Sequence, residues 1–237
     1  MLERGFARQI ESKVARLYKV LLGRLAEGSA EIILTPKEYG EFCYSIAIQY
    51  TRVPSFRDKM ELFIKMRGEQ LFDQLVEKQR QDGTLPDEIE KILQNDMPQI
   101  IIEDFGTIKP MLEAAMPVSN ALMDKTPGFF RSATGSYFFT SDNPVSYYVK
   151  NFEKYDIRQV EPVHPDAEVF FPINRTNAVV FFPHKSGYGS TRHAIGCKCL
   201  DFLSSGVKFI NSRTVIMAKR YVYTSERVET LANYDKE

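Results

Sequence analysis

The stretch from Ser136 to Val149, with the sequence SYFFTSDNPVSYYV, decides how the rest of the chain is interpreted. Its first aromatic residues favour a β-strand, because aromatic side chains fit a pleated, half-buried surface. Ser141, Asp142 and Asn143 then offer three short polar side chains that stabilise turns by bonding to nearby backbone. Pro144 fixes its own φ and pushes the preceding residue out of the α region, and a second extended segment follows. The stretch therefore predicts a tight, rigid corner between two strands.

Helical periodicity dominates the sequence before this corner. One apolar stripe of an amphipathic helix runs through the first 25 residues, at Leu2, Phe6, Ile10, Val14, Leu17, Leu21 and Leu25. Thr35, Pro36 and Glu38 then have the composition of a capped helix start. The residues that follow, 39–51, are apolar on nearly every side of a helix, which predicts a central position in a helical bundle.

Two further helices are predicted in the first half of the chain. The first covers residues 55–80 after the break at Pro54, and the second is a short helix over residues 88–95. The apolar positions of the long helix are expected to face inward, and they are Phe56, Met60, Phe63, Ile64, Leu71, Phe72 and Leu75. Residues 97–124 continue the helical pattern, with prolines that should cut or kink it.

Short β-like segments replace the helical pattern from residue 126 onward. Adjacent phenylalanines occur four times, and each pair is soon followed by polar or turn-forming residues, at 129–130, 138–139, 170–171 and 181–182. We interpret them as four aromatic strands that each end near a turn. A late helix over residues 200–217 and a final strand over residues 221–224 complete the pattern.

The chain is therefore predicted to be a single α+β domain over residues 1–237. An N-terminal helical bundle (residues 1–125) is expected to pack on a C-terminal antiparallel β-sheet (residues 126–225, with the one late helix), followed by a polar tail (residues 226–237). Segregated helices and strands usually pack as two layers around one core. Without the sheet, one end of the helical bundle would be exposed to solvent. We therefore expect the two parts to fold as one cooperative unit and not as two independent domains.

Composition limits the classes of function. The 31 basic and 31 acidic residues give a formal net charge of zero, which argues against a generic electrostatic grip on nucleic acid. No apolar run approaches the roughly 20 residues that span a bilayer, and the first residues have no signal-peptide core. Three cysteines do not make a disulfide framework, so we expect a cytoplasmic protein that does not bind a membrane.

The corner supplies the first candidate site. Ser141, Asp142 and Asn143 would place a hydroxyl, a carboxylate and an amide on a rigid frame at a strand end, where functional groups commonly lie. In the catalytic interpretation, Asp142 acts as base or orienting carboxylate and Asn143 positions the ligand. The alternative is a well-made turn in which these side chains bond to their own backbone.

Gln49, Arg52 and Arg57 supply the ligand-binding candidates. Gln49 and Arg52 share one face of the apolar helix, and an arginine there needs a partner, for which Asp142 and Glu11 are candidates. Placed beside Asp142, the two arginines would suit a phosphate or carboxylate group through bidentate bonds. The alternatives are a solvated helix face and a buried structural network.

His193, Cys197 and Cys199 form a His-x-x-x-Cys-x-Cys segment with metal-binding residue types. The spacing is not that of a standard zinc knuckle, and a fourth ligand is not apparent. We therefore expect no metal site there, and interpret the cysteines as small apolar residues packed in a strand. No Gly-rich phosphate loop or dinucleotide fingerprint occurs, and the sequence specifies no cofactor.

Three segments of the chain resemble a known family. Residues 139–145, FTSDNPV, resemble the signature of a bacterial family known as domain of unknown function 4238, and residues 49–57, QYTRVPSFR, resemble its Gln-x-x-Arg-x-Pro-x-x-Arg segment. Asn211, Ala218 and Arg220 resemble its closing segment, an Asn-bearing helix that leads into a last strand. Members usually begin with a His-His-x-x-Pro segment. We expect this chain to lack it, because its first residues already follow the helical pattern. The family carries no established activity, so the resemblance implies architecture more than chemistry.

Two hypotheses of function remain open. In the first, an anion-binding cleft at the helix–sheet junction takes a nucleotide, a nucleic acid or another anionic ligand, in a hydrolase or nuclease-type effector. In the second, the protein is a non-catalytic binding or regulatory protein with a protein partner, and Gln49, Arg52 and Asp142 form a buried hydrogen-bond network. The first hypothesis depends on one spatial expectation, that the proline corner meets the arginine-bearing helix.

Overall fold

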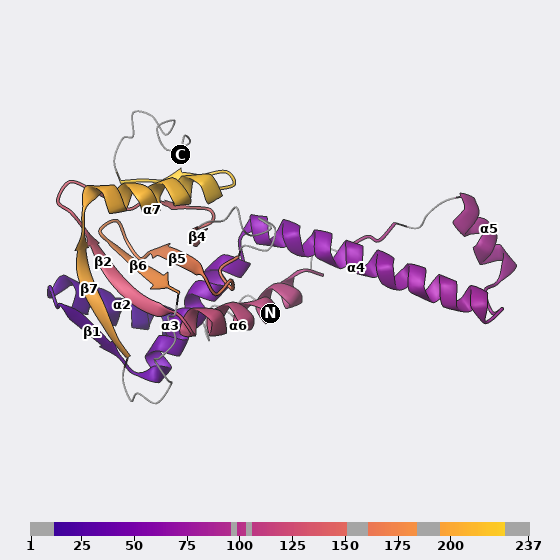
Figure 1. Cartoon of the computed structure of the whole chain (residues 1–237), viewed down its shortest axis with the longest axis horizontal. Helices are drawn as coiled ribbons and strands as arrows, with labels where there is room; N and C mark the ends of the chain where they lie inside the picture. Colours follow the sequence, from indigo (N-terminus) through magenta and orange to yellow (C-terminus); the bar gives the residue numbers. More distant parts are fainter. Residues whose placement is uncertain (1–11, 96–98, 103–105, 151–160, 184–194, 226–237) are drawn as a thin grey trace.

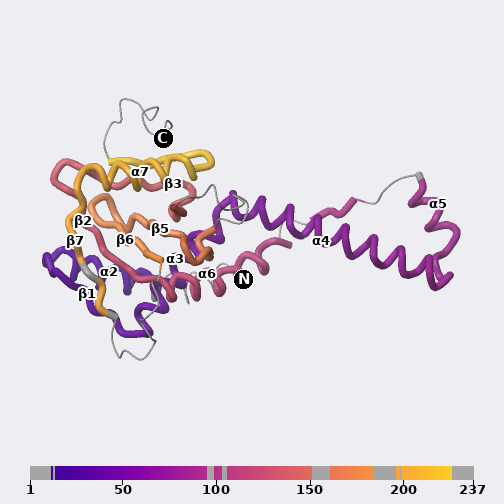
Figure 2. The backbone as a smooth tube through the Cα atoms, viewed as in Figure 1, coloured from indigo at the N-terminus to yellow at the C-terminus, as the bar shows by residue number. Residues whose placement is uncertain are grey.

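The structure, a computed structural model of the chain, describes residues 12–95, 99–102, 106–150, 161–183 and 195–225. Figure 1 shows a body, in which helices lie on both sides of a twisted sheet, and a long helical extension that leaves the body on one side. The backbone trace in Figure 2 shows that this extension is made by α4 (Pro54–Gln81) and α5 (Asp87–Asn95).

The body contains α2 (Ser12–Ala26), α3 (Pro36–Thr51), α6 (Ile108–Met123) and α7 (Ser204–Met217). Its main sheet, within the described residues, has the strand order β1 (Glu31–Leu34), β7 (Ile195–Phe202), β2 (Thr126–Ser132), β6 (Asn177–Phe182), β5 (Ala167–Pro172) and β4 (Ser146–Val149). The short strands β3 (Thr140–Ser141) and β8 (Val222–Tyr223) pair separately. The predicted α+β class is confirmed.

The prediction of a purely antiparallel sheet is wrong at one pairing. β2 runs parallel to β7, from Gly128 opposite Lys198 to Ser132 opposite Phe202, whereas the other described pairs are antiparallel. A parallel neighbour requires a long crossover connection, and the chain between β2 and β7 supplies it through the other half of the sheet. β1 comes from the mainly helical first part and forms one edge, so helices and strands are less segregated than predicted.

The paired phenylalanines follow from a sheet that is buried on both faces. Neighbouring strand residues point to opposite faces, so Phe129 joins the cluster made with α2, α3 and α6, whereas Phe130 joins the cluster made with α7. The ring centroid of Phe42 on α3 lies 5.9 Å from that of Phe129. The expected two layers around one core are therefore wrong, because α7 adds a third layer and a second cluster (Figure 1).

Three of the four aromatic strands are confirmed, in β2, β5 and β6, but residues 138–139 lie outside any strand. The backbone N–H of Phe138 donates to the carbonyl oxygen of Arg175 at 2.8 Å, and that of Phe139 donates to Asn211 Oδ1 at 2.9 Å. These partners replace a strand ladder. The late helix begins at Ser204 and not at residue 200, because residues 200–202 belong to β7 and Leu203 is the N-cap residue.

The predicted capping box of α3 is confirmed. The Glu38 backbone N–H donates to Thr35 Oγ1 at 3.2 Å, and the Thr35 backbone N–H donates to Glu38 Oε2 at 2.8 Å. The central position of α3 is also confirmed, because Phe42 and Ile46 are fully buried between the sheet and neighbouring helices. Of the first apolar stripe, Leu17, Leu21 and Leu25 are buried, and the positions before residue 12 lie outside the described residues.

The inward orientation predicted for the seven apolar residues of α4 is wrong for three of them, and Met60, Ile64 and Phe72 are half-buried. Phe56 is buried in the body, but Phe63, Leu71 and Leu75 are exposed. The physical reason is that α4 leaves the body after its first turns, so the sheet and the other helices of the body do not cover its outer part (Figure 1). α4 is long, yet no helix in the described ranges is apolar enough to cross a membrane.

Candidate functional site

The corner after β3 is held by reciprocal bonds within its own turn. The backbone N–H of Asn143 donates to Ser141 Oγ at 3.1 Å, and the Ser141 hydroxyl donates to the Asn143 carbonyl oxygen at 2.7 Å. Ser141 and Asn143 are both buried. The Ser141 hydroxyl therefore donates one hydrogen bond and accepts another within the turn. This is the structural role that the sequence analysis gave as the alternative to catalysis.

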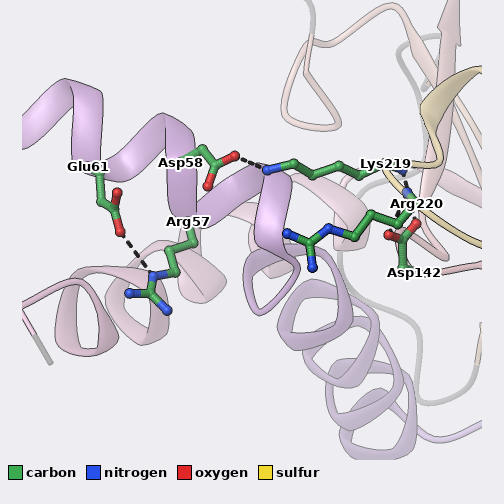
Figure 3. Close-up of polar contacts among 6 residues, drawn as sticks. All are labelled: Arg57, Asp58, Glu61, Asp142, Lys219 and Arg220. Carbon is green, nitrogen blue, oxygen red and sulfur yellow. Dashed lines mark hydrogen bonds and ion pairs between the residues drawn. The ribbon is translucent and has the colours of Figure 1, made fainter. Parts of the chain in front are cut away.

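Asp142 holds the segment that leaves α7. Its Oδ1 accepts the backbone N–H of Lys219 at 3.0 Å, and its Oδ2 accepts the backbone N–H of Arg220 at 2.8 Å. The backbone N–H of Asp142 in turn donates to the Tyr221 carbonyl oxygen at 3.1 Å. Charge-assisted hydrogen bonds to backbone amides are strong and directional, so the Asp142 carboxylate fixes the backbone from which the Lys219 and Arg220 side chains extend (Figure 3).

Two asparagines continue this attachment. Asn211 on α7 accepts from the Phe139 backbone N–H through Oδ1 and donates from Nδ2 to the Tyr137 carbonyl oxygen, both at 2.9 Å. Asn143 Nδ2 donates to the Met217 carbonyl oxygen at the end of α7, at 3.1 Å. The corner is therefore a clamp that fixes α7 and the following strand against the sheet. Within the described chain, Asn143 Oδ1 and Ser146 Oγ are buried without a hydrogen-bond partner.

The corner and the start of α4 are joined through Lys219. Its Nζ forms an ion pair with the carboxylate of Asp58, as Figure 3 shows. The neighbouring Arg57 donates from Nε to Glu61 Oε1 at 3.0 Å, one turn further along α4. The side chain of Arg220 extends away from Asp142 in the same view, and its guanidinium makes no ion pair among the residues that the structure describes.

The end of α3 lies on the same side of the body. Arg52 is the C-cap residue of α3, with its backbone N–H bonded to the Ile48 carbonyl oxygen at 3.1 Å, and its side chain is exposed. Gln49 is half-buried, whereas Ser45 is buried and donates to the Phe42 carbonyl oxygen at 2.7 Å. Exposure therefore increases along this face of α3, and Arg52 reaches solvent because the helix ends there. The second partner suggested for it, Glu11, lies outside the described residues.

Aromatic side chains connect α3 with the strand after the corner. The rings of Tyr50 and Tyr147 meet edge to face, with centroids 6.5 Å apart. Burial, reinforced by the nearby Glu161 carboxylate, raises the pKa of Tyr147 to about 12 and raises the pKa of Tyr50 as well. Glu161 also lies 3.4 Å from Lys59 Nζ on α4. Both phenols remain neutral at physiological pH and act as packing groups of the junction.

The cysteines of β7 do not take part in this junction. Cys197 and Cys199 are buried in the hydrophobic cluster below the sheet, and burial raises the pKa of the Cys197 thiol to about 12. His193 lies outside the described residues. Among the residues that are described, no group of three or more histidine, cysteine, aspartate or glutamate side chains could hold a metal ion.

Lys219, Arg220 and Asp58 are the residues that sequence reasoning missed. Arg220 was noted only for its resemblance to a family segment, and Asp58 not at all. One feature of the sequence could have identified Lys219 and Arg220. They are two basic residues in the short connection between a helix and a strand, where side chains lie near both elements. Nothing local indicates that Asp142, 77 residues earlier than Lys219, would fix their backbone.

Comparison with known proteins gives a family without an activity. The sequence model of a family described as "Protein of unknown function (DUF4238)" matches residues 1–227 of the chain. No curated protein matches the chain, and no solved structure matches it.

Proposed function

Because the chain belongs to the family described as Protein of unknown function (DUF4238), whose description names no activity, we propose a function from geometry alone. The junction between the corner and the arginine-bearing helices binds an anionic, phosphate-bearing ligand, with Arg220, Arg52 and Arg57 as its cationic groups. Asp142 serves as the carboxylate that positions Arg220.

The observation that carries this proposal is the pair of hydrogen bonds that the Asp142 carboxylate accepts from the backbone N–H groups of Lys219 and Arg220. It fixes the origin of the Arg220 side chain while leaving the guanidinium exposed. A side chain that starts from a fixed backbone loses less freedom on binding, which favours affinity. Arginine also matches the geometry of a phosphate group through two parallel hydrogen bonds.

The ion pair between Lys219 and Asp58 supports the inclusion of α4. Arg220 follows Lys219 in the chain and Arg57 precedes Asp58, so the pair brings the two arginine-bearing segments together. Arg57 is also bonded to Glu61, an exposed contact that contributes little stability and can rearrange around a ligand.

Binding without catalysis is the form of the proposal that the geometry favours. Both oxygens of Asp142 already accept backbone N–H groups, the Ser141 hydroxyl closes the turn, and the Asn143 side-chain amide donates to the Met217 carbonyl oxygen. A hydrolase or nuclease would need a further base within hydrogen-bond reach of the nucleophile. The three corner residues therefore act as positioning groups, and the ligand is a nucleotide, a nucleic acid or another phosphate-bearing molecule.

Titration of the purified full chain with three probes tests this function. The probes are inorganic pyrophosphate, ATP and a fluorescein-labelled single-stranded DNA, and at least one should bind. Arg220→Ala should weaken that binding by about tenfold or more, because a hydrogen bond to a charged group contributes about 1.5–3 kcal/mol. Arg52→Ala should weaken it without lowering the melting temperature beyond the range of a surface change.

Arg67→Ala is the matched control, because Arg67 is exposed on α4 but lies further along the helix. Its affinity for the probe should equal that of the unchanged chain. Failure of all three probes to bind, or equal losses in Arg67→Ala and Arg220→Ala, would refute the proposal. Turnover of a probe that disappears in Asp142→Asn would instead assign catalysis to the corner.

A further inference from the structure

The segment that follows α5 contacts the outer part of α4 at Gly68. α4 is 28 residues long, which corresponds to about 42 Å, and most of it lies outside the body (Figure 2). Ile100, on the segment that follows α5, lies directly against Gly68, where a Cβ atom would clash with its Cδ1. Arg80 and Glu90 join the ends of α4 and α5 through bonds of 3.0 and 2.9 Å. Ile100 thus covers α4 at Gly68, and the Arg80–Glu90 pair ties the start of α5 to the far end of α4.

The side opposite Gly68 carries an apolar patch. Helical geometry of about 100° per residue places Leu62, Phe63 and Met66 roughly 120–160° around the axis from Gly68. Their exposed fractions are 60%, 61% and 52%, respectively. Large apolar side chains gathered on one exposed face are unusual for a monomeric protein and mark an interaction surface. We call Leu62, Phe63 and Met66 the arm patch.

Charges on the same face are arranged symmetrically about Met66. Lys59 precedes Met66 by seven residues and Asp73 follows it by seven, which places both within about 20° of Met66 around the helix axis. A second α4 laid antiparallel on the patch, with the two Met66 side chains at the axis, would set each Lys59 opposite an Asp73. A parallel arrangement would set lysine against lysine and aspartate against aspartate. The Lys59 and Asp73 charges are therefore complementary in the antiparallel direction only.

We propose that the arm patch binds a second copy of this chain, forming a two-fold dimer in which two α4 helices run antiparallel. The two Met66 side chains provide the centre of the interface. Phe63 and Leu62 flank it and face Glu69 and Gln70 of the other copy, and Lys59–Asp73 pairs on either side set the direction of the helices. Lys59 Nζ also lies 3.4 Å from Glu161 within its own chain, but that pair is exposed. The interface is isologous, so the same patch is used by both copies.

The oligomeric state of the full chain tests the proposal. Sedimentation equilibrium should give a monomer–dimer equilibrium. Met66→Lys should raise the dissociation constant by a factor of about 30, because it places two like charges at the centre of the interface. Ile216→Lys is the matched control, because Ile216 is 48% exposed on α7 and does not belong to the arm patch, and this change should leave the equilibrium unaltered. Far-ultraviolet circular dichroism confirms that both variants are folded.

Charge exchange and cross-linking test the direction of the helices. Lys59→Asp and Asp73→Lys should each weaken the dimer, and the double variant should restore it. The three cysteines of the chain are buried, so an introduced surface cysteine is selectively accessible. Under mild oxidation, Met66→Cys should form a disulfide-linked dimer. Asp73→Cys alone should not, because its two copies would be about 21 Å apart along an antiparallel pair.

A chain that stays monomeric at all accessible concentrations would overturn the proposal and leave the patch to a different protein. A dimer that Ile216→Lys disrupts as strongly as Met66→Lys would place the interface elsewhere. Efficient cross-linking of Asp73→Cys would show parallel helices, which also contradicts the proposed dimer. None of these outcomes depends on anion binding at the junction, so this inference and the proposed function stand or fall separately.

Discussion

Helices α3 and α4 follow each other in the chain but have opposite surroundings. Nine of the 16 residues of α3 are buried, against one of the 28 residues of α4, so α3 forms the centre of the body and α4 projects from it. α3 begins with a complete capping box, whereas the N-cap residue of α4, Val53, makes no side-chain bond. α4 therefore forms without a side-chain hydrogen bond at its N-cap, so the capping box does not account for the difference between the two helices. What differs is the presence of a sheet to cover them.

This difference shows what apolar periodicity can and cannot predict. A stripe of apolar residues predicts a helix with a face that avoids water, but it does not identify the covering surface. On α3 that surface is the sheet, and Phe42 contacts both Phe129 and Phe181. On the outer part of α4, Ile100 contacts the helix at Gly68, whereas Phe63, Leu71 and Leu75 stay exposed.

The largest effect is expected from removing a core side chain in the body. Leu122 on α6 has no exposed surface, and Leu122→Ala should lower the free energy of unfolding by about 2–5 kcal/mol through lost burial and an unfilled cavity. Urea denaturation followed by circular dichroism measures this loss. A change below about 1 kcal/mol would mean that the layer between α6 and the sheet can collapse around the missing atoms.

Asn211 should rank next, although it is polar. Asn211→Ala leaves the Phe139 N–H and the Tyr137 carbonyl oxygen without their partner, which should cost about 2–3 kcal/mol. Ser212→Ala is the control, because that hydroxyl makes an exposed bond to the Lys208 carbonyl oxygen within α7. The same urea experiment should give it a loss within about 0.5 kcal/mol. Equal losses in both variants would remove Asn211 from the clamp.

How much the sequence could predict depends on the sequence distance between partners. The Thr35–Glu38 capping box was predictable because both residues lie within one turn. The strand expected at residues 138–139 was wrong because the amide of Phe139 is taken by Asn211, 72 residues later. The parallel pairing of β2 with β7 has the same origin, since no local pattern specifies which strand a segment will join.

The candidate site shows the same limit. The turn at Ser141 and Asn143 was predictable from their residue types, and the two hydrogen bonds between these residues agree with that prediction. The partners of Asp142 did not follow, because they are backbone groups of Lys219 and Arg220 that any residue type could supply. The roles of Gln49, Arg52 and Arg57 in ligand binding stay predictions.

The helix cap of α3 gives an intermediate effect. Thr35→Ala should lower the free energy of unfolding by about 1 kcal/mol, because the Glu38 backbone N–H at the first turn loses its acceptor. Val53→Ala cannot reproduce this loss through capping on α4, since Val53 makes no side-chain cap bond. Thermal unfolding followed by circular dichroism measures the change. Retention of full stability in Thr35→Ala would show that packing alone fixes the start of α3.

Glu38 makes the same cap sensitive to acid. The backbone N–H of Thr35, which donates to its carboxylate, holds the pKa of Glu38 below its ordinary value of 4.5. A lowered folded pKa means that the contribution to stability is complete above 4.5 and is lost as pH falls through the folded value. The advantage of the unchanged chain over Glu38→Gln, about 0.5 kcal/mol at neutral pH, should therefore vanish in acid. Urea denaturation at neutral pH and near pH 3 compares the two proteins, and a constant difference would contradict the assignment.

Leu75 completes the comparison, because Leu75→Ala removes the same atoms as Leu122→Ala. Leu75 is 60% exposed on α4, so its truncation loses little burial and leaves no cavity, and alanine is slightly the better helix former. The free energy of unfolding should change by less than about 0.5 kcal/mol. Urea denaturation of both variants at one low protein concentration, where a dimer would dissociate, measures the two losses side by side. A loss at Leu75 close to that at Leu122 would mean that Leu75 is covered within a single chain, which would contradict its exposed position on α4.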